Sequence, residues 1–133
     1  MKLVILIGLS GSGKTTYYNK NLKDKYLFYD DYISNIFDGK LINELKRNEK
    51  DICIADPRLC NYSIFLRLMN LLENYINKSD INIILFENDK EKCIKNAIKR
   101  GNRNVKKSIE FNSIIYNLEN YKDYNYKIME IMI

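Results

Sequence analysis

The sequence of 133 residues has no histidine and no tryptophan, and it contains one proline and three cysteines. Cys53, Cys60 and Cys93 form no CxxC pair, and without histidine the chain lacks the ligands of the usual Cys/His zinc site. So few cysteines also argue against a disulfide scaffold. We therefore predict a protein of a reducing compartment, the cytoplasm, whose stability depends on apolar packing.

Long hydrophobic runs are also missing. The apolar run that starts at Leu3 and ends at Leu9 follows Lys2 and precedes Ser-Gly-Ser, so it imitates a short signal peptide. It is far shorter than the roughly 20 residues of a membrane span, and cleavage behind it would destroy a glycine-rich loop. We interpret the run as a buried strand and expect no membrane partner.

The composition is 46% hydrophobic and 29% charged, which supplies a core and excludes a disordered chain. The length fits one domain over residues 1–133. A net charge of +5 favours phosphate-rich partners. The abundance of Lys, Asn, Ile and Tyr is also what an AT-biased coding sequence produces, so charge alone selects no partner.

Apolar, β-branched segments alternate with segments of helical spacing along the chain. Strands are expected at 3–7, 26–29, 52–55, 81–86 and 126–132, and helices at 14–22, 32–50, 61–77, 88–100 and from 108 onward. This order predicts an α/β three-layer sandwich: a five-stranded, mostly parallel sheet with helices on both faces. We expect Asn88 with Glu91 to cap the fourth helix, Ser108 to cap the fifth, and Ile114 to face inward.

The first expected strand leads into a glycine-rich loop, which a helix follows. Glycines let several amides face one anion, and the helix dipole adds to the attraction. We expect Lys14 to reach the β and γ phosphates of ATP or another nucleoside triphosphate, and the Thr15 hydroxyl to bind Mg²⁺. The predicted nucleotide contacts of this P-loop are Gly8, Ser10, Gly11, Ser12, Gly13, Lys14, Thr15 and Thr16.

Acidic residues follow two of the expected strands: Asp30 and Asp31 after the second, and Asp56 after the third. Open α/β sheets bind ligands beyond the carboxyl ends of their strands, so these acids are expected near the phosphates. One acid can take a proton from an attacking hydroxyl, and another can hold magnesium. Spacing does not assign these tasks, and Asp31 fits a solvated turn equally well.

The expected fourth helix is rich in lysine and ends at Arg100, with Arg103 just beyond it. A mobile basic segment can bring an arginine onto a migrating phosphoryl group. We therefore predict a lid over residues 88–107, with Arg100 and Arg103 as phosphate contacts. The alternative is a solvated helix face whose lysines offset the neighbouring acids.

The glycine-rich loop, the acids after the second and third expected strands and the arginine that ends the fourth expected helix follow one another along the chain. In this order they resemble the motifs of the bacteriophage type of polynucleotide 5′-hydroxyl kinase and of related small P-loop kinases. The resemblance covers residues 1–110 and is carried by Gly-Ser-Gly-Lys-Thr, Asp30-Asp31-Tyr32, Ile54-Ala55-Asp56 and Lys99-Arg100-Gly101. It implies that Asp30 is the general base, that Arg100 contacts the nucleotide phosphates, and that Asp56 lies near the acceptor or the metal. The chain departs from the family at two positions where that family has arginine, Ile33 and Asn96, and the candidates to compensate are Arg58 and Arg103.

The leading interpretation is an ATP-dependent kinase for a hydroxyl acceptor, in first place the 5′ end of DNA or RNA. Its alternatives are a small-molecule kinase for a nucleoside, nucleotide or sugar, and a nucleotide-dependent regulator or toxin acting on a protein. A nonspecific nucleic-acid binder is a further alternative. The sequence leaves the acceptor and the oligomeric state open. The predicted roles are catalysis by Asp30, Lys14 and Arg100, metal binding by Thr15 and Asp56, and substrate contact by Asp30, Asp31, Asp56 and Arg58.

Overall fold

The computed structural model describes residues 1–31, 33 and 39–131. In these ranges five strands form one sheet in the order β2-β3-β1-β4-β5, and all neighbouring strands are parallel. The strands are β1 (Leu3–Ile7), β2 (Tyr26–Asp30), β3 (Asp51–Ala55), β4 (Ile81–Phe86) and β5 (Asn125–Met129). The helices are α1 (Lys14–Asn21), α2 (Lys40–Arg47), α3 (Tyr62–Leu72), α4 (Lys90–Lys99) and α5 (Lys106–Ile115).

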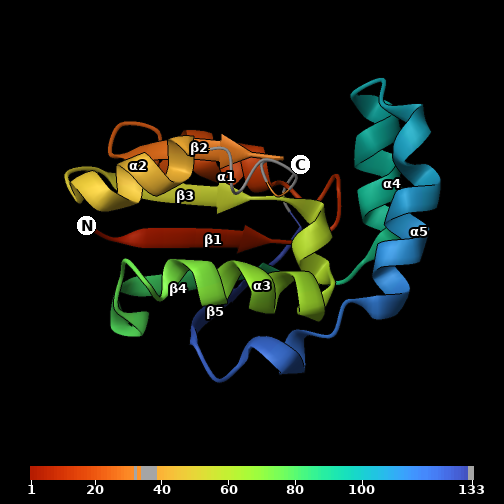
Figure 1. Ribbon diagram of the computed structural model, residues 1–133. Coiled ribbons are helices and arrows are strands. Elements are labelled where there is room, and N and C mark those ends of the chain that lie inside the picture. Colours follow the sequence, from red (N-terminus) through yellow and green to blue (C-terminus); the bar gives the residue numbers. More distant parts are fainter. Residues whose placement is uncertain (32, 34–38, 132–133) are drawn as a thin grey trace.

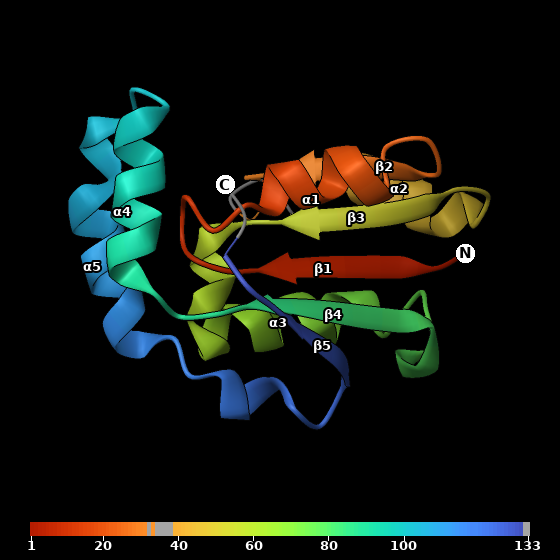
Figure 2. The same ribbon diagram turned by 180° about the vertical axis from the view of Figure 1, so that it is seen from behind.

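The helices form layers on both sides of the sheet, as predicted. Helices α2 and α3 lie over the face seen in Figure 1, and α1 lies over the face seen in Figure 2. Helices α4 and α5 instead stand together beyond the carboxyl ends of the strands, on the right in Figure 1. We call this pair the arm, residues Lys90–Ile115.

Strand β1 shows why the sheet is covered on both faces. All its residues are buried, and neighbouring side chains on a strand point to opposite faces. Leu3, Ile5 and Ile7 pack in the larger core, with α2 and α3. Val4 and Leu6 pack in the smaller core, with α1. Such a strand reads as a continuous apolar run, which is what the sequence contains.

The connections place a crevice at the carboxyl end of β1. The chain leaves β1 through α1 toward β2, and it leaves β3 through α3 toward β4, on the opposite face. The two connections therefore diverge at the ends of β1 and β3, which are neighbours in the sheet. Such a divergence point is where open α/β sheets bind their ligands.

The predicted cap of the fourth helix is wrong. The carboxylate of Asp89, not the side chain of Asn88, accepts a hydrogen bond from the Lys92 amide at 3.1 Å. Asn88 instead donates to the carbonyls of Ser113 and Tyr116, at 2.8 and 3.0 Å. Asn88 therefore ties the start of α4 to the end of α5, which stabilises the base of the arm.

Two expectations for the fifth helix are also wrong. The helix begins at Lys106, so Ser108 lies inside it and does not cap it. Ile114 is 83% exposed rather than inward-facing. Because the arm stands clear of the sheet, only a narrow stripe of α5, which includes Ile109 and Asn112, is buried.

The remaining differences concern the lengths of elements. The last strand, expected at 126–132, is β5 over Asn125–Met129. The helix expected at 61–77 ends at Leu72. Of the helix expected at 32–50, the structure has α2 over Lys40–Arg47, while residues 32 and 34–38 lie outside the described residues. None of the helices in the described ranges is both long enough and apolar enough to cross a membrane.

Candidate active site

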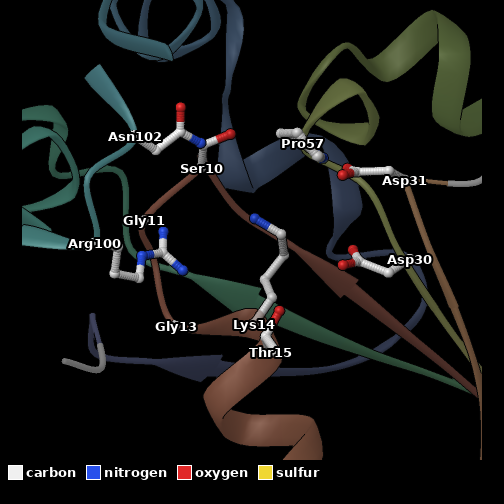
Figure 3. A pocket seen from close by; sticks show the side chains of 10 residues that line it. All are labelled: Ser10, Gly11, Gly13, Lys14, Thr15, Asp30, Asp31, Pro57, Arg100 and Asn102. Carbon is white, nitrogen blue, oxygen red and sulfur yellow. The ribbon is translucent and has the colours of Figure 1, made fainter. Parts of the chain in front are cut away.

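A pocket of about 280 Å³ lies in the crevice, between the carboxyl ends of the strands and the arm. It brings together residues from the P-loop, the end of β2, the turn after β3 and the end of α4. Figure 3 shows its lining, which consists of Ser10, Gly11, Gly13, Lys14, Thr15, Asp30, Asp31, Pro57, Arg100 and Asn102. Most of the predicted site residues therefore meet in one place.

The P-loop leaves amides available for an anion. Gly11 and Gly13 have φ angles of 83° and 99°, a region that glycine adopts without strain. The Ser12 amide is bonded to the Leu9 carbonyl at 3.1 Å. Within the described part of the chain, the amides of Gly11, Gly13 and Lys14 have no such backbone acceptor. Unpaired amides at the start of a helix are suited to bind phosphate.

The other predicted loop contacts differ in how they meet the pocket. Ser10 and Thr15 line it, whereas Thr16 is half-buried in α1 and is not part of the lining. Gly8 is buried at the start of the loop, where a methyl group would lie 2.9 Å from the Phe86 Cβ atom. Gly8 thus allows the loop to pass close to β4.

Lys14 is the buried cation of the pocket. Its Nζ donates hydrogen bonds to the carbonyls of Gly8 and Leu9, at 2.7 and 2.8 Å. Burial lowers the pKa of Lys14, and neighbouring anionic groups, which include Asp30 and Asp31, act in the opposite direction. Its side chain projects into the pocket (Figure 3), so an entering phosphate would meet a preplaced ammonium group.

Asp30 and Asp31 both face Lys14 across the pocket (Figure 3). Asp31 has a φ angle of 51°, and its amide donates to the Ala55 carbonyl at 2.9 Å. This turn lets two successive carboxylates line the same wall. Partial desolvation in the pocket and the charge of Asp31 raise the pKa of Asp30, and the Lys14 ammonium opposes this shift.

Asp56 is fully buried and is not among the residues that line the pocket. Its Oδ1 accepts hydrogen bonds from the amide and the Nε of Arg58, at 2.8 and 2.9 Å. Its Oδ2 accepts from an Arg58 guanidinium nitrogen at 2.7 Å and from the Ile33 amide at 3.1 Å. The structure therefore pairs Asp56 with Arg58 beside the site, and the predicted roles of both toward metal and substrate remain predictions.

The arm contributes two side chains to the pocket. The exposed Arg100 at the end of α4 extends its guanidinium toward the P-loop, from the side opposite to the carboxylates (Figure 3). Asn102 also lines the pocket. Sequence reasoning missed Asn102, whose only signal is its place just after Gly101. The side chain of Arg103 lies outside the described part of the structure.

The oxygen donors of the pocket suit a magnesium ion that arrives with a nucleotide. The described residues contain no group of three or more His, Cys, Asp or Glu that could hold a metal. The Thr15 hydroxyl and the carboxylates of Asp30 and Asp31 nevertheless share the pocket. Magnesium is usually bound by one or two protein oxygens together with phosphates and water, so this sparse set fits it.

Comparison with known proteins identifies the fold and a relative. No protein-family model matches the chain. A crystal structure of Chaetomium thermophilum Kti12 in complex with ADP-AlF3 is similar with a TM-score of 0.52 and 17% identity, covering 96% of this chain and 88% of that one. At this identity the similarity concerns the fold alone. It confirms the predicted α/β three-layer sandwich, which is that of the P-loop NTPases.

The sequence is 34% identical over 134 residues to "Uncharacterized protein R277" of Acanthamoeba polyphaga mimivirus. The match covers 98% of this chain and 96% of the relative. A likeness of this extent reaches across all elements of the sheet and the arm. The chain, which has the P-loop NTPase fold, therefore belongs to the same family as this mimivirus protein.

Proposed function

We propose that the protein is an ATP-dependent phosphotransferase that phosphorylates a hydroxyl group, with the 5′ end of DNA or RNA as the acceptor. One observation carries this proposal: cations and carboxylates face each other across a single pocket. Lys14 lies in its centre, Arg100 on one side and Asp30 with Asp31 on the other (Figure 3). Phosphoryl transfer needs positive charge around the phosphate and a base at the incoming hydroxyl.

The P-loop side is the phosphate side. The free amides of the loop and the Lys14 ammonium are suited to the β and γ phosphates of ATP or of another nucleoside triphosphate. Kti12, whose fold this chain shares, was crystallised with ADP-AlF3, which supports a nucleotide as the ligand of this chain. Magnesium, held by Thr15 and the nucleotide, would neutralise charge on the phosphate oxygens.

The carboxylate side is the acceptor side. Asp30 takes the proton of the acceptor hydroxyl while the oxygen forms a bond to the γ phosphorus. The bond between this phosphorus and the β–γ bridging oxygen breaks, and ADP leaves with the electron pair. The raised pKa of Asp30 makes its carboxylate a stronger base than an ordinary aspartate. Arg100 balances the negative charge that develops on the transferred group.

The charge of the arm supports a polyanionic acceptor. Between residues 90 and 115 the chain has eight Lys or Arg and two Glu, so this segment alone exceeds the net charge of +5 of the whole chain. The arm borders the pocket through Arg100 and Asn102. A nucleic-acid strand whose 5′ end enters the pocket would find its phosphates attracted to the arm.

The proposal is tested by transfer of label from γ-labelled ATP. The acceptors are 5′-hydroxyl DNA and RNA oligonucleotides, the same oligonucleotides carrying a 5′ phosphate, and a panel of nucleosides, nucleotides and sugars. We expect magnesium-dependent labelling of the 5′-hydroxyl oligonucleotides only, lost in Lys14→Ala and kept in Lys20→Ala, an exposed lysine on the same helix. If only a nucleoside, nucleotide or sugar is labelled, the protein is a small-molecule kinase and the proposed nucleic-acid acceptor is wrong. If the protein binds ATP and labels none of the acceptors, a regulator that acts on a protein is favoured.

A further inference from the structure

The arm contacts the P-loop directly through helix α4. The Nδ2 of Asn96 on α4 donates a hydrogen bond of 2.9 Å to the carbonyl oxygen of Gly11, and Asn96 is only 9% exposed. One turn earlier on α4, the Cys93 carbonyl oxygen lies so close to Gly11 that a methyl group there would overlap with it. Helix α4 thus contacts the loop at two successive turns.

The hydrogen bond from Asn96 orients the peptide group between Gly11 and Ser12, which forms hydrogen bonds at both of its ends. In a trans peptide the carbonyl and the following amide point in opposite directions. The carbonyl of Gly11 points to Asn96, and the Ser12 amide accordingly points back to the Leu9 carbonyl, at 3.1 Å. The same Leu9 carbonyl accepts the Lys14 ammonium at 2.8 Å. A short chain of hydrogen bonds therefore leads from α4 to the buried lysine.

Asn96 also stands in a fixed relation to the arginine of the pocket. Its backbone carbonyl accepts the Arg100 amide at 3.2 Å, one helical turn farther along. One residue therefore contacts the P-loop through its side chain and the end of α4 through its backbone. The base of the arm is further anchored by Tyr116, which directly follows α5 and whose hydroxyl donates to the Phe86 carbonyl at the end of β4, at 2.6 Å.

We infer that Asn96 is a positioning residue that sets the shape of the P-loop and its distance from Arg100. In this arrangement α4 is a fixed wall of the nucleotide site and not a lid that opens fully at each turnover. The inference rests on the proposed function. The polynucleotide kinases that the sequence resembles have an arginine at this position, which is expected to contact phosphates. Asn96 has a different role, because its side chain binds the backbone of the P-loop.

The first test removes the donor without adding charge. Asn96→Leu is compared with Asn112→Leu, since Asn112 is an asparagine of the same arm, 8% exposed, whose Nδ2 bonds Ser108 and not the loop. Without nucleotide, we expect hydrogen exchange in residues 8–14 to be roughly tenfold faster in Asn96→Leu than in Asn112→Leu. Equal exchange in the two variants would overturn the inference.

The second test measures function. We expect the Kd for Mg-ATP to rise roughly tenfold or more in Asn96→Leu, whereas Asn112→Leu stays near wild type. An unchanged Kd in Asn96→Leu, with normal binding by the wild type, refutes the positioning role and leaves the proposed function intact. A wild type that binds no nucleoside triphosphate refutes the proposed function, and the positioning role with it.

A third variant keeps the shape of the side chain. In Asn96→Asp the ionised carboxylate cannot donate to the Gly11 carbonyl, but the protonated form can. The ratio of its Mg-ATP affinity to that of the wild type should therefore recover as the pH falls, by roughly tenfold once the carboxyl is protonated. A ratio that stays constant with pH contradicts the role, because a purely structural defect would not respond to protonation.

Discussion

Asp56 and Arg58 form an ion pair in which both carboxylate oxygens are bonded to the same guanidinium group. Nε lies 2.9 Å from Oδ1, and a terminal nitrogen lies 2.7 Å from Oδ2. The guanidinium also donates to the Asp31 carbonyl at 3.3 Å, and Asp56 accepts the Ile33 amide. The pair thus holds the backbone that follows β2, next to the two pocket carboxylates.

Removing this carboxylate should destabilise the fold. Asp56→Ala leaves the Arg58 and Ile33 donors without their acceptor, so we expect a loss of about 2–4 kcal/mol in the free energy of unfolding. Urea denaturation provides the measurement. The control is Asp51→Ala at the start of β3, where a half-buried carboxylate accepts the Lys2 amide and a change below about 1 kcal/mol is expected. If Asp56→Ala kept its stability but required far more magnesium, a metal role would be favoured instead.

The proposed base predicts a variant that is inactive yet well folded. Asp30→Asn should lower turnover by roughly 10²–10⁴-fold and leave nucleotide affinity nearly unchanged, since the proposed base lies on the acceptor side and the P-loop holds the phosphates. A carboxyl whose pKa is raised in the folded state binds more protons there than in the unfolded chain. The unfolding free energy therefore decreases as the pH rises from the pKa of Asp30 in the unfolded chain to its higher pKa in the folded protein.

At neutral pH, Asp30→Asn should consequently be at least as stable as the wild type. Thermal melting and initial-rate kinetics on one preparation check both statements. Near-normal turnover would remove Asp30 from the role of base, and a large drop in stability would contradict the direction of its pKa shift.

The carboxylate of Asp31 should influence the pH at which kcat/KM falls on the acid side. The base must be ionised, so kcat/KM falls when the pH drops below the pKa of Asp30. Asp31→Asn removes a negative charge that raises this pKa, and asparagine tolerates the φ angle of 51°. We expect the acid limb to move to lower pH. The same substitution at the exposed Asp24 should leave the limb in place, and a shift to higher pH in Asp31→Asn would contradict the argument.

Arg100 should contribute to the rate more than to nucleotide binding. Arg100→Ala is expected to lower kcat by roughly 10²–10³-fold, because the charge that develops in the transition state loses its partner. Arg100→Lys should recover only part of this loss, since a lysine lacks the planar fork of donors. Single-turnover kinetics make the comparison, with the exposed Lys99→Ala as the control outside the pocket lining. Equal rates for the variants at the two positions would show that only the general charge of the arm matters.

Two glycines with similar backbone angles should respond differently to the same substitution. Gly11 and Gly101 have φ angles of 83° and 78°, so alanine costs about 1–2 kcal/mol of backbone strain at either position. At Gly101 the added methyl group meets nothing within 4 Å, whereas at Gly11 it overlaps with the Cys93 carbonyl. We expect Gly11→Ala to lose nucleotide binding and considerably more stability. Calorimetry of both variants tests this. Equal stability and equal nucleotide binding in the two variants would mean that α4 shifts to make room for the methyl group at Gly11.

The sequence by itself determined the order of elements and the phosphate loop. These follow from local chemistry: a buried parallel strand reads as a continuous apolar run, and a glycine-rich turn before a helix presents amides. The placement of Asp30 and Asp31 was equally predictable, because the carboxyl ends of parallel strands lie at one edge of a sheet. The pocket brings these acids, Lys14, Thr15 and Arg100 together.

Only the tertiary structure decided which partners the other polar groups find. Asp56 follows its strand just as Asp30 does, yet its carboxylate is taken by Arg58, two residues farther along. Asn96 meets a carbonyl that is 85 residues distant in sequence. Such contacts depend on the path of the crossovers and on the closeness of α4 to the loop, and neither is encoded in the spacing of residues along one segment. For the same reason Ile114, on an arm that stands clear of the sheet, is exposed despite its apolar side chain.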